Sequence, residues 1–568
     1  MLGVLATARE PVAPAMLAEV LNADLGPVRA VQRALPDFLR LREGKLTFDH
    51  FSLAEWLIGE NGEGLERAGD FAVEREASQA RWHAWALGQV SAGNAHRSGY
   101  LLRHLAAHLP DMHERADVYQ RLLGSFDWIH QRVVRDDFAS LSADIENIVD
   151  SPAKNTLKAF LFKSFRLLQK YSLQSASQII GRLSDDPSEL ISALVLDTKR
   201  HLSGASKVGD VNLLIPGSRS LCLRPAGQET IPKHMSSVQI LAVLANGHIA
   251  SGGHDNMIRI WNPTTCSEVC VLSGHTQYIN SLIPMEDDRL VSGGADGLIQ
   301  VWDLKSGQIL KTFAACTSGG ESQAVVGWSN SSIIGTMDND GNVRVLDVFG
   351  ETGVGPVVAA SNVQSLCAMR DGSTFACGGM DRTVQLIDAA GNTDLIEIEH
   401  GHRIMWVAEL KDNRLVFATY VHTQILVFDR STKHFVHCQG HVGGFGVLLE
   451  LHDGRIVWGG YDGILRIWNI KLGGEPVLLK GHTKWVYAIA QLPDGRLISS
   501  SDDRTIRLWN VETLHSNIAF VADNTITCLA LAGDIVVAGC LGDGTVHFLR
   551  WASLVGIDGE QLRICRGA

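Results

Sequence analysis

Cysteine is scarce in this chain of 568 residues, and its distribution excludes two kinds of structure. All ten cysteines fall from Cys222 onward, and no Cys-x-x-Cys pair occurs. Neither a zinc site nor a disulfide framework is therefore indicated. Buried, reduced thiols are the expected state, which favours a reducing compartment and a cytoplasmic protein.

Long apolar runs and targeting segments are also missing. No stretch of about 18 uninterrupted apolar residues occurs, which argues against a transmembrane helix. The opening MLGVLATAREPV has only a brief apolar run, followed by Arg9 and Glu10, and lacks the basic start and longer apolar core of a signal peptide. We therefore expect a soluble chain that does not use a membrane as partner.

Several kinds of chemistry lack their motifs. No GxxxxGK[ST] segment occurs, so ATP hydrolysis through a phosphate-binding loop is not expected. The formal net charge of −12 argues against a nucleic-acid partner, which would require a basic surface. The histidines of the N-terminal part have no HExxH or comparable spacing, and neither a metal nor another cofactor is expected: His83, His96, His104, His108 and His113.

Glycine, by contrast, is abundant, with 56 residues against only 15 prolines, as is typical of a chain with many tight turns. The clearest unit runs from Gly481 to Asn510, GHTKWVYAIAQLPDGRLISSSDDRTIRLWN. It predicts three short strands, because Asp-Gly between apolar runs is a strong hairpin signal and a second turn falls at Asp502-Asp503. One such sheet is marginally stable alone, so the unit needs neighbours.

The same template recurs along the second part of the chain. The position of Trp509 recurs every 40 to 44 residues, at Trp261, Trp302, Leu346, Ile387, Phe428, Trp468 and Leu549. The turn six residues earlier holds Asp255, Asp296, Asp340, Asp381, His422, Asp462, Asp503 and Asp543. A histidine precedes four of those turns by 21 residues, at His234, His275, His441 and His482. This period is that of a four-stranded propeller blade.

These spacings resemble the WD-repeat β-propeller family over residues 227–552. The eight third-strand positions predict eight blades, and seven is the alternative if the longer third repeat forms no blade of its own. The expected fold class is therefore multidomain, α plus all-β. A strand at 228–232 is expected to complete the last blade from its N-terminal side, which would close the ring and protect its edges.

The resemblance also implies a buried network in several blades, in which the turn Asp, a His, a Ser and a Trp are hydrogen-bonded. The implied sets are His234, Ser251, Asp255, Trp261; His275, Ser292, Asp296, Trp302; and His482, Ser499, Asp503, Trp509. The sixth repeat keeps His441, Asp462 and Trp468 but has Trp458 at the Ser position. Because the constellation recurs and nucleophilic catalysis needs one site, we interpret the sets as structural and expect no enzyme.

The first 205 residues predict helices. Helical segments at 2–8, 14–21 and 26–35, a hairpin about Glu43-Gly44 and a helix through SLAEWL predict a winged-helix-like domain over residues 1–60. Residues 61–205 predict a helical array. Turn-rich residues 206–226 are expected to form a linker to the propeller, and residues 553–568 a C-terminal tail.

This order of elements resembles the part of STAND-class signalling NTPases (the NB-ARC and NACHT groups) that follows their nucleotide-binding domain. In DHFSLAEWL, His50 stands where those proteins place a nucleotide-sensing His, with Phe51 where the best-known version has Asp. The resemblance implies signal transduction coupled to an NTPase domain, upstream or on a separate chain. The alternative is that His50 is an ordinary packed histidine.

One rim of the propeller is the predicted partner-binding surface. In the family, the residue before each turn Asp and the residue before each inner strand project to this rim. Tyr, Trp and Arg are the types that dominate binding hot spots. A non-catalytic scaffold or sensor that binds a protein partner is the expected function; the alternatives are a substrate adaptor of a modifying complex and an enzyme with its site at the channel mouth. The predicted rim residues are His254, Tyr278, Asn339, Met380, Arg403, Tyr461, Trp485 and Asp502.

Overall fold

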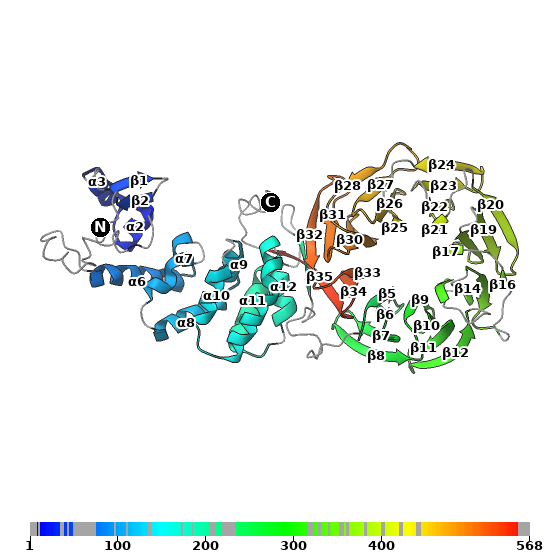
Figure 1. Ribbon diagram of the computed structural model, residues 1–568, viewed down its shortest axis with the longest axis horizontal. Coiled ribbons are helices and arrows are strands. Elements are labelled where there is room, and N and C mark those ends of the chain that lie inside the picture. Colours follow the sequence, from blue (N-terminus) through cyan, green and yellow to red (C-terminus); the bar gives the residue numbers. More distant parts are fainter. Residues whose placement is uncertain are drawn as a thin grey trace. The chain divides into compact units, whose positions relative to one another are not determined.

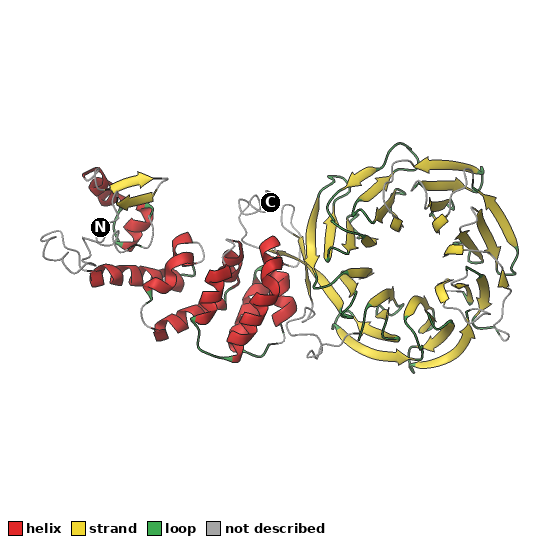
Figure 2. Ribbon diagram, in the orientation of Figure 1, coloured by secondary structure: helices red, strands yellow, loops and turns green. Residues whose placement is uncertain are grey.

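The computed structural model describes most of the chain. Described are Ala8, residues 12–203 with gaps at 35–38, 43–44, 49–74, 96–97, 110–111, 135–137, 172–173 and 185, residues 212–216, and residues 234–554 with gaps at 316–321, 328–330, 339–340, 351–356, 359–362, 380–382, 399–403, 420–423 and 439–444. The chain divides into two compact units, one mainly helical and one mainly of strands (Figure 2).

The helical unit begins with two helices and a hairpin. Helix α2 (Pro14–Val20) and helix α3 (Leu25–Ala34) precede the antiparallel pair β1 (Leu39–Arg42) and β2 (Lys45–Phe48). Val12 forms a further antiparallel bridge to Leu46. The side chains of both residues are buried in one core with Leu17 and Trp82. The two helices and the hairpin are confirmed; the predicted helices at 2–8 and through SLAEWL, and His50, lie outside the described residues.

Helices build the rest of this unit. A buried ion pair stabilises their packing, because Arg132 of α9 donates to both carboxylate oxygens of Asp144 on α10, which also accepts from Trp128 Nε1 at 3.0 Å. No described helix is both long and apolar enough to cross a membrane. The helices are α6 (Arg75–Ser91), α7 (Gly99–His108), α8 (Met112–Leu123), α9 (Phe126–Val134), α10 (Phe138–Glu146), α11 (Pro152–Lys170), α12 (Ser175–Leu183) and α13 (Glu189–Arg200).

The strand-rich unit is a ring of eight blades around a central opening (Figure 1). In blades one to seven, numbered in chain order, four consecutive strands form an antiparallel meander from the inner to the outer edge. The third repeat forms a blade of its own, so the prediction of eight blades is confirmed. Gly495, in the predicted Pro-Asp-Gly turn, has φ of +88°, which glycine adopts without strain.

The strand bounds follow the repeat. Blades one to four are β5 (Val238–Val243), β6 (Ile249–Gly253), β7 (Met257–Asn262), β8 (Ser267–Ser273); β9 (Ile279–Met285), β10 (Arg289–Gly294), β11 (Leu298–Asp303), β12 (Gln308–Ala314); β13 (Ser322–Gly327), β14 (Ile333–Asp338), β15 (Val343–Asp347), β16 (Val357–Val358); and β17 (Val363–Ala368), β18 (Thr374–Gly379), β19 (Thr383–Asp388), β20 (Thr393–Glu397). Blades five to seven are β21 (Ile404–Glu409), β22 (Leu415–Thr419), β23 (Ile425–Asp429), β24 (His434–Cys438); β25 (Phe445–Glu450), β26 (Ile456–Gly460), β27 (Leu465–Trp468), β28 (Val477–Leu479); and β29 (Val486–Gln491), β30 (Leu497–Ser501), β31 (Thr505–Trp509), β32 (Ser516–Val521).

The outer strand of blade eight is not the one that the sequence analysis predicted to close the ring. Its chain-order strands are β33 (Ile526–Ala532), β34 (Ile535–Cys540) and β35 (Val546–Leu554). The outer partner of β35 is β4 (Asn212–Pro216), and β3 (Leu202–Ser203) pairs with the end of β35. The N-terminal side does complete the last blade, but with residues 212–216 of the supposed linker. The predicted strand at 228–232 lies outside the described residues.

The boundaries of the propeller move accordingly. Its strands begin at Leu202, ahead of the predicted start at residue 227, and the last strand runs to Leu554, past the predicted end at 552. Apolar cores fill the spaces between blades, and one of them joins Val238 and Trp261 of blade one to Val537 and Phe548 of blade eight. This core closes the ring through side-chain packing in addition to backbone pairing.

Candidate protein-binding rim

The hydrogen-bonded network implied by the resemblance is present in blade seven. His482 Nδ1 lies 2.9 Å from Asp503 Oδ2, and His482 Nε2 lies 2.8 Å from Ser499 Oγ. Ser499 Oγ also accepts from Trp509 Nε1 at 2.7 Å. Asp503 Oδ1 accepts from the Thr505 backbone N–H at 3.0 Å and from its hydroxyl at 2.6 Å. These bonds connect the loop before the inner strand to the second and third strands.

The network fixes the charge states of its members. Burial acts to raise the pKa of Asp503, but the hydrogen bonds from His482 and Thr505 outweigh it, so this pKa lies well below its usual range. Burial lowers the pKa of His482, and Asp503 opposes that shift only in part. A carboxylate beside a neutral imidazole is therefore the state at neutral pH.

Blades one and two contain the same three bonds. In blade one the distances are 2.8 Å for His234 Nδ1 to Asp255 Oδ1, 2.6 Å for His234 Nε2 to Ser251 Oγ and 2.7 Å for Trp261 Nε1 to Ser251 Oγ. In blade two they are 3.0 Å for His275 to Asp296, 2.7 Å for His275 to Ser292 and 2.8 Å for Trp302 to Ser292. All three Ser side chains are fully buried, which supports a structural role and not that of a nucleophile.

Blade six has a tryptophan where the other sets have serine, as its sequence indicates. Trp458 occupies the strand position of Ser499 and is fully buried. Asp462 accepts from the Arg466 guanidinium, at 3.2 Å from Nη1 and 2.6 Å from Nη2, and Trp468 Nε1 donates to the Gly474 carbonyl at 3.0 Å. The indole supplies no hydroxyl to accept from Trp468, whose Nε1 bonds the Gly474 carbonyl instead. His441 lies outside the described residues.

Aromatic side chains gather where blades six and seven meet on the predicted rim. The ring of Tyr461 lies 4.2 Å from that of Trp485, edge to face, and Trp485 lies 4.5 Å from Tyr487. Tyr461 is 53% exposed. Trp485 is half-buried because its Nε1 packs on Gly446, where a Cβ would come within 2.6 Å. We call Tyr461, Trp485 and Tyr487 the aromatic cluster.

Asp502 adjoins the aromatic cluster. Its carboxylate accepts from Lys484 Nζ at 3.0 Å and from Thr525 Oγ1 at 2.7 Å. Its backbone N–H donates to the Trp485 carbonyl at 2.9 Å, which fixes the turn against the start of the inner strand. The carboxylate of Asp502 therefore joins Lys484 of blade seven to Thr525 at the start of blade eight.

A second pair of rings occupies the junction of blades one and two. The ring of His254 stacks on that of Tyr278 at 4.8 Å, and His254 Nε2 lies 2.6 Å from Gln239 Nε2. The predicted rim residues thus form two groups in the described part of the chain. The other three, Asn339, Met380 and Arg403, lie outside it.

Two rim features escaped the sequence analysis. Leu541 donates its backbone N–H to Thr525 O as Asp502 does to Trp485 O, so it holds the rim position of blade eight, and it is 38% exposed. The turn there has one residue more before Asp543 than the template allows, which obscured the match. Tyr487 was missed because it lies inside the inner strand, where the pattern predicted only packing.

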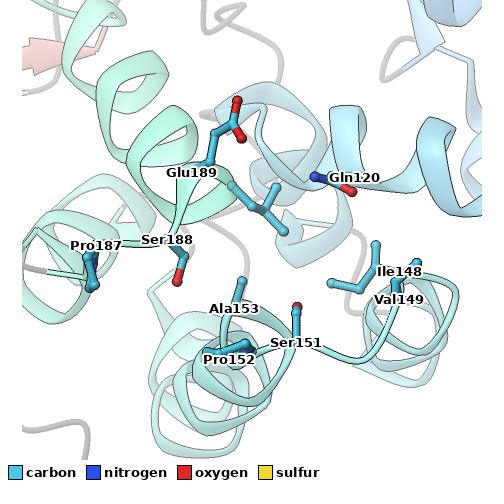
Figure 3. A pocket seen from close by; sticks show the side chains of 10 residues that line it. Gln120, Ile148, Val149, Ser151, Pro152, Ala153, Pro187, Ser188 and Glu189 are labelled. Carbon is cyan, nitrogen blue, oxygen red and sulfur yellow. The ribbon is translucent and has the colours of Figure 1, made fainter.

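The described residues also form two clefts away from this rim. A cleft of about 410 Å³ in the helical unit is lined mainly by apolar side chains such as Ile148, Val149 and Leu190, with Glu189 at its edge (Figure 3). A polar cleft of about 390 Å³ lies among the turns of blades six and seven, at Asp453 and Asp494. No group of metal-ligating side chains occurs among the residues that the structure describes.

Comparisons with known proteins found the following similarities. The family described as WD domain, G-beta repeat, matches residues 228–262, 266–303, 357–388 and 475–510. The chain is 23% identical over 232 residues to WD repeat-containing protein srw1 of Schizosaccharomyces pombe, covering 39% of this chain and 41% of that protein. A crystal structure of the computationally designed Ika8 protein is similar at a TM-score of 0.49 and 26% identity, over 56% of this chain and 98% of that one.

Fold, repeats and family match together define the class. The chain has an N-terminal helical region and an eight-bladed β-propeller, four segments of which match the WD domain, G-beta repeat, family. It spans under half the length of the curated relative that it matches.

Proposed function

We propose that this chain is a non-catalytic interaction protein whose propeller binds a protein partner at the rim that carries Tyr461, Trp485, His254 and Tyr278. The observation that carries the proposal is the gathering of aromatic side chains at two blade junctions of one rim. Exposed Tyr and Trp side chains supply large contact areas at low entropic cost. The bonds that fully engage each buried Ser hydroxyl support the non-catalytic part.

The test uses the chain as bait in an extract of its source organism. We expect a Tyr278→Ala, Tyr461→Ala double variant to lose more than about 2 kcal/mol of affinity for the captured protein, on the order of thirtyfold. The half-buried Trp485 is left in place, because its removal would disturb the junction itself. Leu310→Ala, Leu395→Ala is the matched control, with side chains 50% and 59% exposed on outer strands. Equal affinity of both double variants would exclude this rim.

A finer proposal concerns the helical unit. We infer that it couples the propeller to a nucleotide-binding domain of the STAND type and that the protein acts in cytoplasmic signalling. The helix–helix–hairpin order with the bridge from Val12 to Leu46 supports this inference. Reading frames upstream of Met1 and in adjacent genes provide the test: a GxxxxGK[ST] segment is expected, and its absence would favour the substrate-adaptor alternative.

A further inference from the structure

The two aromatic groups of the rim occupy equivalent positions but differ in their surroundings. His254 and Tyr278 are the counterparts of Tyr461 and Trp485, 207 residues earlier in each case. In blade two, the counterpart of Tyr487 is Asn280 and that of Asp502 is Ala295. The backbone confirms the last equivalence, because Ala295 donates to Tyr278 O as Asp502 does to Trp485 O, at 2.9 Å in both. One junction therefore combines three rings with a carboxylate, and the other has neither the third ring nor the acid.

A carboxylate, that of Asp502, lies close enough to the aromatic cluster to act on Tyr487. Aromatic faces carry the negative part of the ring quadrupole, and Tyr461 leaves half of its surface open. Burial, and then the charges of Asp502 and Tyr461, raise the pKa of Tyr487, which is the response expected next to negative charge. Such a site favours a cation, above all one that can stack on a ring while it bonds a carboxylate.

A cation of the chain itself already marks the position. Lys484 Nζ bonds Asp502 Oδ2 at 3.0 Å, and the Lys484 side chain is 59% exposed. Exposed ion pairs of this kind contribute little free energy, so a better-placed cation can replace the ammonium group. A planar guanidinium has the advantage over Lys484, because it can stack on Tyr461 and donate to Asp502 together.

We propose that the aromatic cluster and Asp502 bind an arginine side chain of the protein partner, which stacks on Tyr461 and displaces Lys484 from the carboxylate. This rests on the proposed function, since it names the chemistry that the partner presents to the same rim.

The experiment compares two synthetic peptides. One is a Gly-Ser peptide with two arginines, and the other carries citrulline at both positions, which keeps the shape and removes the charge. We expect the arginine peptide to bind the full chain about five- to tenfold more tightly by calorimetry. Tyr461→Leu, which keeps an apolar side chain without a π face, and Asp502→Asn should each abolish that preference.

Two further variants sharpen the test. Lys484→Ala should raise the affinity for the arginine peptide, because it removes the competing ammonium group. The Leu310→Ala, Leu395→Ala double variant, on outer strands away from the rim, should leave binding unchanged. Thermal unfolding of each variant checks the fold, which we expect to be retained because Tyr461 and Lys484 are largely exposed.

Some outcomes would overturn the proposal. Equal binding of the two peptides, weaker binding by Lys484→Ala, or an unchanged preference in Tyr461→Leu would each show that the cluster does not recognise a guanidinium. If the captured protein still requires Tyr278 and Tyr461 in that case, the rim remains the binding surface and only the arginine anchor is wrong. If neither experiment responds to Tyr461, both proposals fail.

Discussion

Blades six and seven are neighbours with the same strand order, but different bonds hold their interiors together. In blade seven a hydroxyl joins His482 and Trp509, and Asp503 closes the network. In blade six an indole, Trp458, replaces that hydroxyl, and a guanidinium takes the turn carboxylate. The pairings of the first three strands nevertheless correspond position for position, down to the register shift in the first strand pair. The outer strand pair differs, because only that of blade seven has a register shift.

The comparison separates what makes a blade from what reinforces it. Both blades have second strands that are buried on every residue, and both contribute to cores shared with a neighbouring blade. Turn residues and apolar packing are common to the two blades, whereas the polar network is not. The sheet therefore depends on packing and turns, and each blade can reinforce it with its own set of polar contacts.

The largest effect is expected from Trp458→Ser, which gives blade six the residue type of blade seven. The substitution should destabilise the propeller by about 3–5 kcal/mol, because it empties the space of a fully buried indole. Asp462 and Trp468 already bond other groups and would gain nothing from the new hydroxyl. Chemical denaturation measures the change; a loss below about 1 kcal/mol would mean that the Ser network re-forms and that the two blades are interchangeable.

Asp503→Ala should have the next largest effect, a loss of about 1–3 kcal/mol, because donors from His482, Thr483 and Thr505 lose their acceptor inside the blade. Denaturation of the variant beside Asp303→Ala, whose carboxylate lies at an exposed turn, provides the measurement and its control. A melting temperature equal to that of the unmodified chain would remove the structural interpretation of the network.

The sequence predicted the blades well where a residue type has a single structural role at a fixed position of the repeat. Asp at a turn, His 21 residues earlier and Trp six residues later recur because the network needs them at those spacings, and eight blades followed from the period alone. The outer strand of blade eight could not be derived in the same way. Strand β4 lies far from β35 in the chain, and NLLIP differs little from other short apolar runs, so only the tertiary pairing identifies it.

The binding rim was predictable only in part. Its positions followed from the repeat, and four of the eight, at the two blade junctions, form close ring pairs. The burial of these side chains could not be predicted from the repeat. Trp485, for example, packs on Gly446 of the preceding blade, and no local sequence pattern indicates that contact. The hydrogen bond between Arg466 and Asp462 in blade six could not be predicted either. The sequence does not show which group the guanidinium faces, and only the pairing of the strands places it beside Asp462.

Acid should weaken blade seven through its histidine. Because the pKa of His482 is lowered on folding, the unfolded chain takes up its proton first, and stability falls as the pH drops below about 6.5. The lowered pKa of Asp503 acts in the same direction at more acidic pH, since its contribution is present above the unfolded value and lost below. Melting temperatures from pH 7.5 to 5.5 test this, and His482→Asn should flatten the slope. Arg466→Lys in blade six should leave the slope unchanged, because the His482–Asp503 pair of blade seven stays in place.

The smallest effect is expected at a feature that the two blades share. The turn between first and second strands carries Asp453 with Arg455 in blade six and Asp494 with Arg496 in blade seven, at 2.7 and 2.6 Å. Each Asp side chain is 49% exposed, so solvent screens the pair and Arg→Ala should cost no more than about 0.5–1 kcal/mol. The two single variants, measured by denaturation under the same salt conditions, should agree within error. A clearly larger loss of stability for one blade would show that its turn depends on the interior network. The comparison of blades six and seven, which treats packing and polar bonds as separate contributions, would then be wrong.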